Sequence, residues 1–358
     1  MLSGRKFRAI MVAALALGGA VSNAQPDERV YRHAAATTPA HRALEARIRE
    51  LGRSFSGEVG IAVREIEGDW STSWNGRRFF PQQSVSKFWV ALTAFAAVDA
   101  GELDLDQPIT IRREDLTLFH QPIAAQVDAD GYTTTLGNLL FRALTQSDNT
   151  CNDAVLRAAG GPTAVRAMLA RRRIQGIRFG PGERLMQSQI AGMRWQQSYS
   201  VGRAFYAARN AVPASVRRNA FENYIENPVD GATPDGIVDA LARLRRGDLL
   251  SPRSTERMIS IMSQTRTGPQ RLTGGLAPGW RIAHKTGTGQ VLGATQAGYN
   301  DIGILTSPEG RHYAVAVLIG RTTIPIQNRM ALMQNVTRAV IAFDEAQRGG
   351  AHYTYQRR

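Results

Sequence analysis

The chain has 358 residues, 43% of them hydrophobic, and a formal net charge of +14. This length is enough for one large domain or two closely packed subdomains, and the single cysteine, Cys151, excludes an intrachain disulfide. The positive charge raises the question of a nucleic-acid partner, but the arginines are scattered, and Arg171–Arg173 is their only run of three. Scattered arginine is typical of a solvated surface, so we expect no nucleic-acid partner and a fold that depends on its hydrophobic core.

Residues 1–24 have the three parts of a secretory signal peptide. A basic start precedes an apolar run at 10–17, and small residues at 22–24 provide a cleavage site between Ala24 and Gln25. The apolar run is too short for a membrane-spanning helix, which needs about 20 residues, and no later segment is apolar enough. We therefore expect a cleaved signal, a periplasmic or secreted protein, and a mature chain without a membrane span.

The first part of the mature chain predicts a loose leader, a helix and a β-hairpin. Residues 25–40 are polar and lack periodicity, whereas apolar residues recur at helical spacing within 41–53. Alternating apolar residues at 59–63 lead through a Glu-Gly-Asp turn into a second alternating run at 70–74.

The middle of the chain predicts helices, and its last part returns to strands. Helical patterns are found at about 84–100, 136–144, 150–158, 162–173, 199–210, 234–246 and 255–263. Strands are expected at 281–285, 299–305 and 312–319, followed by a final helix at about 329–345.

Strands at both ends of the chain, with helices between them, indicate an α+β fold with an antiparallel five-stranded sheet. The N- and C-terminal helices would flank this sheet, and an all-helical subdomain would be inserted into it. We place the α/β subdomain at 41–79 and 250–346, the helical subdomain at 80–249, and a C-terminal tail at 347–358.

A candidate nucleophile and its base stand at the start of the apolar helix. Ser84 precedes Lys87 by three residues, so on a helix the two side chains share a face and the amine can contact the hydroxyl. The pattern alone is weak, because Ser3 and Lys6 in the signal segment have the same spacing. An isolated match of this kind is usually an ordinary helix start.

Lysine is rare in this chain, and its rarity gives the match more weight. Only Lys6, Lys87 and Lys285 occur among 44 basic residues, so arginine carries the general positive charge. Arginine does not lose its proton in a protein, whereas a buried lysine can act as a base or as a compact charge. Lys285 opens a second motif, Lys-Thr-Gly-Thr, and a Ser-Asp-Asn motif at 147–149 lies between the two lysines.

These three motifs, in this order, resemble those of the class A serine β-lactamases, which are penicillin-recognising serine hydrolases. The resemblance extends from about residue 41 to about 346 and includes the segments 160–165 and 271–280. It implies the β-lactamase/transpeptidase-like fold, hydrolysis of the β-lactam amide through an acyl-enzyme on Ser84, and a role in antibiotic resistance. It implies a monomer that takes a small β-lactam as substrate and uses no cofactor and no metal.

The resemblance also implies roles for the catalytic residues. Ser84 would attack the carbonyl carbon with Lys87 as its base, directly or through water. The backbone N–H groups of Ser84 and Thr288 would bind the oxyanion. Ser147 would pass a proton to the leaving nitrogen, and Asn149 would hold Lys87 and a substrate amide.

A second group of residues would bind the carboxylate of the substrate. Lys285 supplies a fixed positive charge at the end of a strand. The group consists of Lys285, Thr286, Gly287, Thr288 and Arg271. Arg271 stands fourteen residues before Lys285, where some class A enzymes carry a carboxylate-binding arginine. The alternative for Arg271 is an ordinary surface position.

A glutamate distinguishes a hydrolase from a protein that stays acylated, because deacylation needs a base that directs water onto the acyl-enzyme. Aligning the segment from Arg178 without a gap puts Glu183 at the deacylating glutamate of the family. Gly182 replaces a usual aromatic residue, and Met186-Gln187 replaces a usual Leu-Asn pair. The usual asparagine helps to hold the water, so Gln187 or another group has to take over that role.

The segment after Glu183 is longer than in typical class A enzymes by about thirty residues, and we place the insertion near 189–227. It is rich in aromatic residues, so we expect helices that pack beside the site. These could be surface helices without a role or a substrate lid. Glu222 and Glu226 within it are the nearest acidic alternatives to Glu183.

Two other functions stay open at this point. A D-alanyl-D-alanine peptidase or an esterase of the same fold would share the three motifs, and the altered neighbours of Glu183 favour it. The other hypothesis is a non-hydrolytic protein that binds β-lactams or peptidoglycan. A mere binder, however, has no need for a deprotonable lysine beside a serine.

Overall fold

The computed structural model describes residues 37–355, with side chains as far as residue 349. The expected signal peptide at 1–24 and most of the leader at 25–40 lie outside the described residues. Helix α1 (Pro39–Ser54) begins slightly before the predicted residue 41, because Thr38 caps it. The Thr38 hydroxyl accepts from the N–H of His41 at 3.2 Å, and Pro39 occupies the first helical position.

Helices make up the middle of the described chain. They are α2 (Lys87–Asp99), α3 (Leu136–Thr145), α4 (Asn149–Ala158), α5 (Gly161–Arg171), α6 (Glu183–Ile190), α7 (Ala204–Ala211), α8 (Ala214–Glu226), α9 (Pro234–Arg246) and α10 (Pro252–Met262). Helix α11 (Ile326–Tyr355) is the last helix of the described residues. A 3-10 helix, η1 (Gln83–Ser86), directly precedes α2. None of the helices within residues 37–355 is long and apolar enough to cross a membrane.

One antiparallel sheet contains five strands in the order β2-β1-β8-β7-β5. Their bounds are β1 Val59–Glu65, β2 Ser71–Trp74, β5 Arg281–Thr288, β7 Thr295–Thr306 and β8 His312–Thr322, and the short β6 (Val291–Leu292) pairs with β7. Strand β1 lies beside β8, with Ile61 opposite Val317. The predicted five-stranded sheet, built from both ends of the chain, is confirmed.

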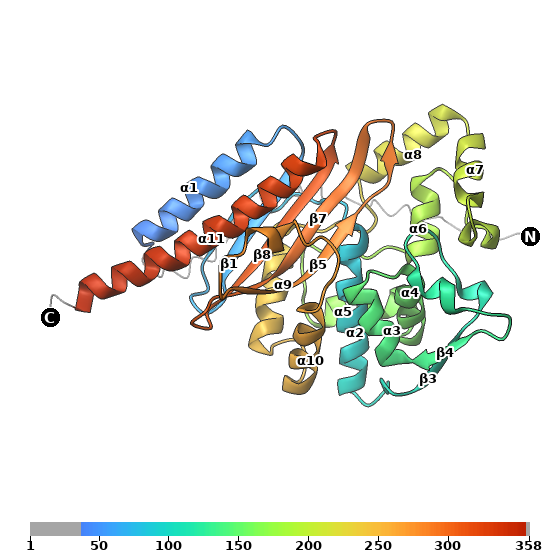
Figure 1. The fold of residues 1–358 in the computed structure, drawn as a ribbon, viewed down its shortest axis with the longest axis horizontal. Coiled ribbons are helices and arrows are strands. Elements are labelled where there is room, and N and C mark those ends of the chain that lie inside the picture. Colours follow the sequence, from blue (N-terminus) through green and yellow to red (C-terminus); the bar gives the residue numbers. More distant parts are fainter. Residues whose placement is uncertain (1–36, 356–358) are drawn as a thin grey trace, which may run out of the picture. The chain divides into compact units, whose positions relative to one another are not determined.

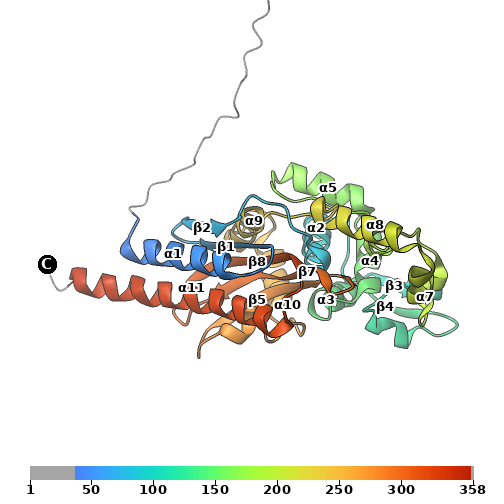
Figure 2. The ribbon, with the colours of Figure 1, turned by 90° about the horizontal axis from the view of Figure 1, so that it is seen from above.

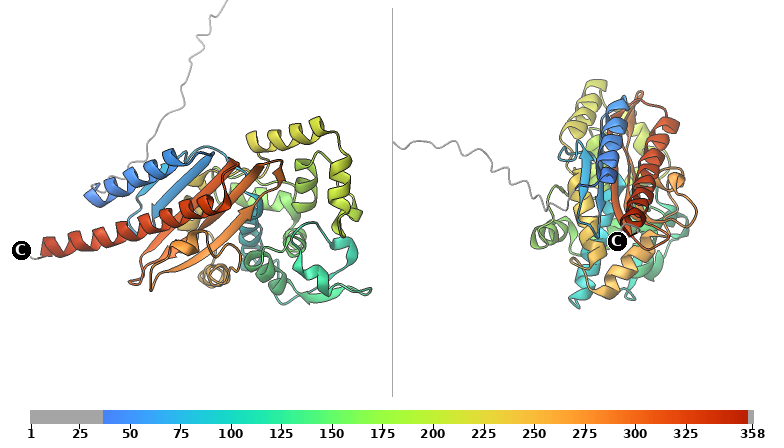
Figure 3. Two further views of the ribbon diagram at one scale, coloured as in Figure 1. Left: turned by 45° about the horizontal axis from the view of Figure 1, so that its top comes forward. Right: turned by 90° about the vertical axis from the view of Figure 1, so that its left-hand side faces the viewer.

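Both faces of this sheet are buried, since successive residues of each strand point to opposite sides. In β8, the odd-numbered residues from Val315 to Ile319 pack with α1 and α11, and the even-numbered residues from Ala314 to Leu318 pack with α2 and α9. Figure 1 and Figure 3 show α1 and α11 running side by side across one face of the sheet. Figure 2 shows α2, α4 and α5 on the side away from these two helices.

Helix α2 lies at the centre of the helical part. It is apolar around its whole circumference, and all its residues from Lys87 to Phe95 are buried. A helix of this kind is stable only inside a core. Its buried position fixes Ser84 and Lys87, which stand at its start.

Three features differ from the predicted elements. A separate two-stranded sheet, β3 (Pro108–Ile111) with β4 (Tyr132–Thr135), was not predicted, because each strand has only four residues. The predicted helix at 199–210 is broken at Gly202, which has a φ of 56°, and only α7 continues beyond it. The segment assigned to a tail at 347–358 is helical as far as Tyr355.

Candidate active site

Ser84 lies on a strained turn at the start of α2. The preceding residue, Gln83, has a φ of 54°, in the left-handed region that residues other than glycine rarely adopt. Such strain costs about 1–3 kcal/mol and persists only where the surroundings impose it. Here the backbone N–H of Gln83 donates to Asp230 at 2.7 Å, and its side-chain amide donates to the hydroxyl of Tyr224 at 2.7 Å. Ser84 is half-buried on this turn, whereas Lys87 is fully enclosed.

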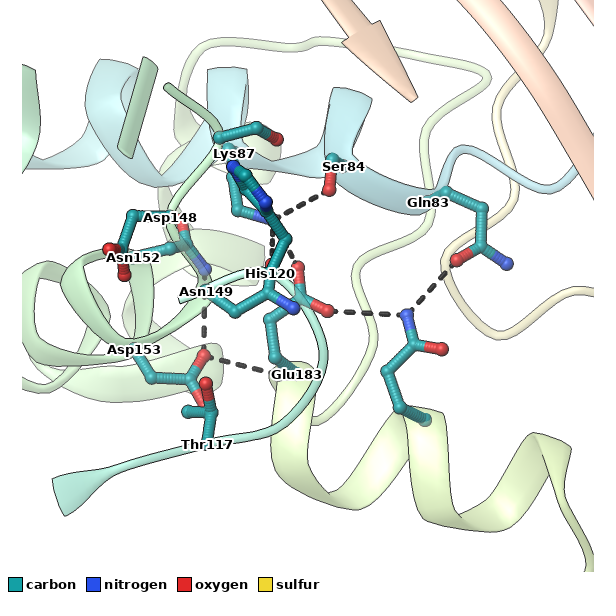
Figure 4. Close-up of polar contacts among 12 residues, drawn as sticks. Gln83, Ser84, Lys87, Thr117, His120, Asp148, Asn149, Asn152, Asp153 and Glu183 are labelled. Carbon is teal, nitrogen blue, oxygen red and sulfur yellow. Dashed lines mark hydrogen bonds and ion pairs between the residues drawn. The ribbon is translucent and has the colours of Figure 1, made fainter. Parts of the chain in front are cut away.

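The amine of Lys87 brings together three residues that are far apart in the sequence (Figure 4). It donates to Ser84 Oγ at 2.7 Å and to Asn149 Oδ1 at 2.8 Å, and it forms an ion pair with the carboxylate of Glu183. The side chains of Lys87 and Glu183 are only 0% and 3% exposed. Because an unpaired buried charge is strongly unfavourable, each of these two groups depends on the other.

The Ser-Asp-Asn turn and the Lys-Thr-Gly strand also meet. Ser147 has a φ of 61°, and Asp148 caps α4 by accepting from the N–H of Cys151 at 2.9 Å. The amine of Lys285 donates to Ser147 Oγ at 2.9 Å and to the carbonyl of Thr286 at 2.8 Å. The hydroxyl of Ser147 is therefore held by a buried lysine.

Arg271 is buried, so the alternative of an ordinary surface position is wrong. Its guanidinium lies 3.8 Å from the centre of the Tyr299 ring and donates to the carbonyls of Gly287 at 2.9 Å and Asn300 at 2.6 Å. It also donates to the hydroxyl of Thr288 at 2.5 Å. These contacts link the end of β5 to β7 and leave the positive charge of Arg271 beside Thr288.

Lys285 should set an alkaline limit on the binding of a carboxylate. Burial, followed by the charges of Lys87 and Arg271, lowers the pKa of Lys285 well below its usual 10.5. The amine is charged below this pKa and neutral above it, so its attraction for a carboxylate is lost as the pH rises through it. We expect kcat/KM for a carboxylate-bearing substrate to fall on the alkaline side, at a pH below that of an ordinary lysine.

An Arg271→Gln variant tests this assignment, because it removes one of the charges that lower the pKa of Lys285. The alkaline limb of the kcat/KM profile should then move to higher pH, whatever the change in absolute rate. Profiles from about pH 6 to pH 10 for both proteins measure the shift. An alkaline limb at the same pH in both would contradict the assignment.

Strand β5 approaches the turn of Ser84 so closely that residue 287 has to be glycine. A Cβ added to Gly287 would lie 2.3 Å from the carbonyl oxygen of Gln82 and 3.2 Å from the backbone nitrogen of Val85. The first distance is shorter than any real contact, so a side chain would push the strand away from the turn. Gly287 therefore sets the distance between Thr288 and Ser84.

A Gly287→Ala variant should lose stability and activity together. Overpacking of a core typically costs about 1–3 kcal/mol, and the displaced strand would also move Thr288. Thermal melting and the hydrolysis rate measure the two effects. Gly274→Ala is the matched control, since the nearest atoms to its added Cβ would be the flexible ends of the Gln334 and Gln270 side chains. Wild-type stability and rate in Gly287→Ala would show that the close approach has no role.

Glu183 begins α6, and its backbone is held by a buried aspartate. Gly182 before it has a φ of 97° and a ψ of 169°, a conformation essentially restricted to glycine, which explains why no aromatic residue stands there. The N–H of Glu183 donates to Asp153 Oδ1 at 3.1 Å (Figure 4). Burial, followed by the charge of Glu183, raises the pKa of Asp153 to about 6.

Gln187 contacts the other side of the Glu183 carboxylate. Its amide nitrogen donates to Glu183 Oε2 at 3.2 Å and to Gln83 Oε1 at 3.0 Å, and Gln290 donates to Gln187 Oε1 at 3.0 Å. Glu183 and Gln187 are four residues apart on one helix, so the longer glutamine side chain reaches the carboxylate directly. The replacement of the usual asparagine therefore retains a polar contact with Glu183.

Gln83, Tyr224 and Asp230 form a buried network behind Ser84 that the sequence analysis missed. The hydroxyl of Tyr224 donates to Asp230 Oδ1 at 2.9 Å, and burial raises the pKa of Asp230 to about 7. Tyr224 belongs to α8, so the segment 189–227, where we place the insertion, supports the turn that carries Ser84. Nothing local in the sequence distinguishes Tyr224 from the other aromatic residues of this segment.

The site residues surround a cavity of about 490 Å³. Its wall contains seven of the predicted residues, namely Ser84, Ser147, Asn149, Glu183, Arg271, Thr286 and Thr288. Lys87 and Lys285 lie behind the wall and contact Ser84 and Ser147. The wall also contains residues that were not predicted, namely Phe119, His120, Tyr206, Arg209, Thr267, Gly289, Gln290 and Val291. Tyr206 and Arg209 belong to the segment 189–227, where we place the insertion, so this segment forms part of the cavity wall.

The alternative bases, Glu222 and Glu226, do not line this cavity. Glu222 forms a hydrogen-bonded ion pair with Arg321, which lowers the pKa of its carboxyl group. Glu226 lines a separate groove beside Asn227. In the described part of the chain, Glu183 is therefore the only acidic side chain in the cavity wall.

Comparison with known proteins shows the family of this chain. A sequence model of the Beta-lactamase enzyme family matches residues 43–343. Beta-lactamase VEB-1 from Pseudomonas aeruginosa is 25% identical over 279 residues, which are 78% of this chain and 83% of the relative. Extended-spectrum beta-lactamase PER-1 from the same organism is 26% identical over 302 residues, which are 84% of this chain and 87% of the relative.

Solved structures show the same fold. A beta-lactamase from Chitinophaga pinensis is 27% identical with a TM-score of 0.69, and the match covers 85% of this chain and 99% of that one. The TLA-3 extended-spectrum beta-lactamase is 22% identical with a TM-score of 0.69, covering 85% of this chain and 98% of that one, and it supports the fold alone. The family match spans most of the chain. The resemblance noted in the sequence is thus confirmed, and the chain belongs to the beta-lactamase enzyme family as a serine enzyme of class A.

Proposed function

We propose that this enzyme hydrolyses the amide bond of β-lactams by acylation and deacylation of Ser84. The observation that carries the proposal is the set of contacts at Lys87, whose amine touches both the hydroxyl of Ser84 and the carboxylate of Glu183. A nucleophile needs a base within hydrogen-bond reach, and a deacylating water needs a second one. Lys87 and Glu183 are groups of the right kind for these two tasks.

In acylation, Lys87 first passes a proton to Glu183 and becomes a neutral amine. Ser84 Oγ then attacks the carbonyl carbon while its proton moves to Lys87 across the 2.7 Å contact. The amide C–N bond breaks, and the proton travels from Lys87 through Ser147 to the leaving nitrogen. Glu183 returns its proton to Lys87, which restores the ion pair and leaves an ester on Ser84.

In deacylation, the Glu183 carboxylate takes a proton from a water molecule while the oxygen of that water attacks the ester carbonyl. The ester bond breaks, and the proton returns to Ser84 Oγ as the product acid leaves. Gln187 supports this step, because its hydrogen bond keeps Glu183 Oε2 in a fixed orientation. This step distinguishes a β-lactamase from a D-alanyl-D-alanine peptidase, which would stay acylated by the β-lactam.

Binding of the substrate carboxylate falls to the cationic end of β5. Lys285 contributes charge from behind Ser147, and Arg271 contributes charge beside Thr288. Thr286 and Thr288 line the cavity, and the Thr288 hydroxyl, which accepts from Arg271, keeps its own proton free to donate. The export signal at 1–24 would deliver the enzyme to the periplasm, where hydrolysis of β-lactams would confer resistance.

Turnover of a chromogenic cephalosporin by the purified protein tests the proposal. We expect sustained hydrolysis, with a transient adduct of one equivalent that peptide mapping locates on Ser84. A penicillin adduct that persists for hours would instead support a D-alanyl-D-alanine peptidase. Reversible binding without any adduct would support a non-hydrolytic receptor.

A further inference from the structure

Helix α7 of the insertion forms a wall of the cavity. Its Phe205 is buried, and the ring centres of Phe205 and Phe119 lie 4.8 Å apart in an edge-to-face contact. The neighbouring Tyr206 is exposed, lines the cavity, and has its ring centre 6.1 Å from that of Phe119. Aromatic packing thus fixes α7 against the loop of Phe119, and Phe119 and Tyr206 present ring surface to the cavity.

Arg209 lies on the same helix and also faces the cavity. It is four residues after Phe205, so the two side chains lie on one side of α7. Its guanidinium lies 5.8 Å from the centre of the Tyr206 ring, and its hydrogen bonds are long, to Gln290 Oε1 at 3.5 Å and to the carbonyl of Val291 at 3.4 Å. Its Nε is buried and has no hydrogen-bond partner within residues 37–355.

No carboxylate within the described residues forms an ion pair with Arg209. The one acidic side chain in the cavity wall, Glu183, is already paired with Lys87. A half-buried guanidinium that lacks a counterion, beside an aromatic surface, can bind an anion attached to an apolar group. A ligand that pairs with Arg209 has to supply the negative charge.

The position of Arg209 along the cavity identifies which part of the substrate it meets. Lys285, Thr286 and Thr288 mark the carboxylate end of β5, whereas Gln290 lies two residues beyond Thr288, roughly 7 Å further along an extended chain. In a β-lactam, the ring carboxylate and the acylamino side chain are attached on opposite sides of the scissile amide. A substrate with its carboxylate near Thr286 and its carbonyl at Ser84 directs its acylamino side chain toward Gln290 and Arg209.

We propose that Arg209, with Tyr206 and Phe119, forms a subsite for β-lactams whose acylamino side chain carries an anionic group next to an aryl ring. This inference rests on the proposed β-lactam hydrolysis and names the preferred substrates of the same site. The aryl ring packs on Phe119 and Tyr206, and the side-chain anion pairs with Arg209. The preference is a property of the insertion, since both Tyr206 and Arg209 come from it.

Three penicillins with the same phenylacetyl framework test the subsite. Benzylpenicillin has no charge on its benzylic carbon, carbenicillin has a carboxylate there, and ampicillin has an amino group. The readout is the ratio of kcat/KM for carbenicillin to kcat/KM for benzylpenicillin, because a general effect of a mutation on the enzyme cancels in this ratio. In Arg209→Gln we expect the ratio to fall about tenfold, as for loss of a partly buried charge-assisted hydrogen bond.

Further variants separate the subsite from a general charge effect. Arg209→Glu reverses the charge at this position. It should lower the ratio of carbenicillin to benzylpenicillin further and raise the ratio of ampicillin to benzylpenicillin. Arg203→Gln is the matched control, because Arg203 precedes α7, is exposed and does not line the cavity. The control should leave both ratios at the wild-type values. An unchanged ratio in Arg209→Gln, or an equal fall in Arg203→Gln, would overturn the proposal.

A failure of the proposed function gives a different result. If none of the penicillins is hydrolysed, the hydrolytic function fails, and the subsite is then tested by the rates at which carbenicillin and benzylpenicillin acylate Ser84. Intact-protein mass spectrometry measures those rates. A preference for carbenicillin that disappears in Arg209→Gln would support the subsite, and equal rates in both proteins would exclude it.

Discussion

Replacing Ser84 with alanine is expected to lower hydrolysis of a chromogenic cephalosporin by at least about 10⁴-fold and to abolish the covalent adduct. The hydroxyl of Ser84 is the group that would bond to the substrate carbonyl, and no other hydroxyl contacts the amine of Lys87 within the described residues. Lys87 would keep its contacts with Asn149 and Glu183, so the fold should survive. Steady-state rates, intact-protein mass and thermal melting measure these effects.

Ser86→Ala is the matched control for this experiment. Ser86 lies in the same 3-10 helix and is buried, but its side chain makes no capping hydrogen bond to α2. The control should hydrolyse the cephalosporin at close to the parental rate and form the adduct. Parental turnover in Ser84→Ala would show that another group is the nucleophile, and the alignment of the three motifs would then have no catalytic meaning.

Local patterns were sufficient to predict much of the fold. Helix α9 occupies the predicted range of 234–246 because Thr233 caps its start and Gly247, with a φ of 84°, ends it. Strands β7 and β8 were found from their apolar runs and the turn between them. The break at Gly202 was missed, since a glycine inside an aromatic, helix-like segment gives no sign of which φ it adopts.

The motif residues could be predicted for a similar reason. Ser84 with Lys87, and Lys285 with Thr288, are neighbours in the sequence, and the order of the motifs carries the family resemblance. The supporting groups could not be predicted, because their partners lie far away along the chain. Asp230 accepts a hydrogen bond from Gln83, which lies 147 positions away in the sequence, and no pattern around either residue indicates the other.

Replacing Glu183 with glutamine should separate the two halves of the reaction. A positioned general base typically contributes about 10²–10⁴-fold, so hydrolysis should slow by this factor. Acylation of Ser84 remains possible, because a buried lysine without its carboxylate partner favours the neutral amine and releases its proton to solvent, and the neutral amine can still take the proton of Ser84. A burst of one equivalent of product followed by an almost flat trace is expected, and the adduct should be visible by intact-protein mass. The variant also leaves Lys87 buried without its carboxylate partner, which typically costs about 3–5 kcal/mol of stability, so thermal melting must accompany the rates.

Glu222→Gln and Glu226→Gln are the matched controls, since they make the same chemical change on α8. Glu222 is paired with Arg321 outside the cavity wall, and Glu226 lines a different groove, so both variants should retain the parental rate without accumulating an adduct. The difference between Glu183→Gln and these controls tests whether Glu183 is the base in a loop that differs from that of typical class A enzymes. Gly182 gives this loop a different backbone, and Gln187 gives Glu183 a different neighbour. If Glu183→Gln turns over at the parental rate, the base is another group, and the gapless alignment from Arg178 to Glu183 is wrong. If the adduct accumulates only in Glu183→Gln, the short contact network of Glu183, Gln187 and Lys87 is sufficient for deacylation despite the altered loop.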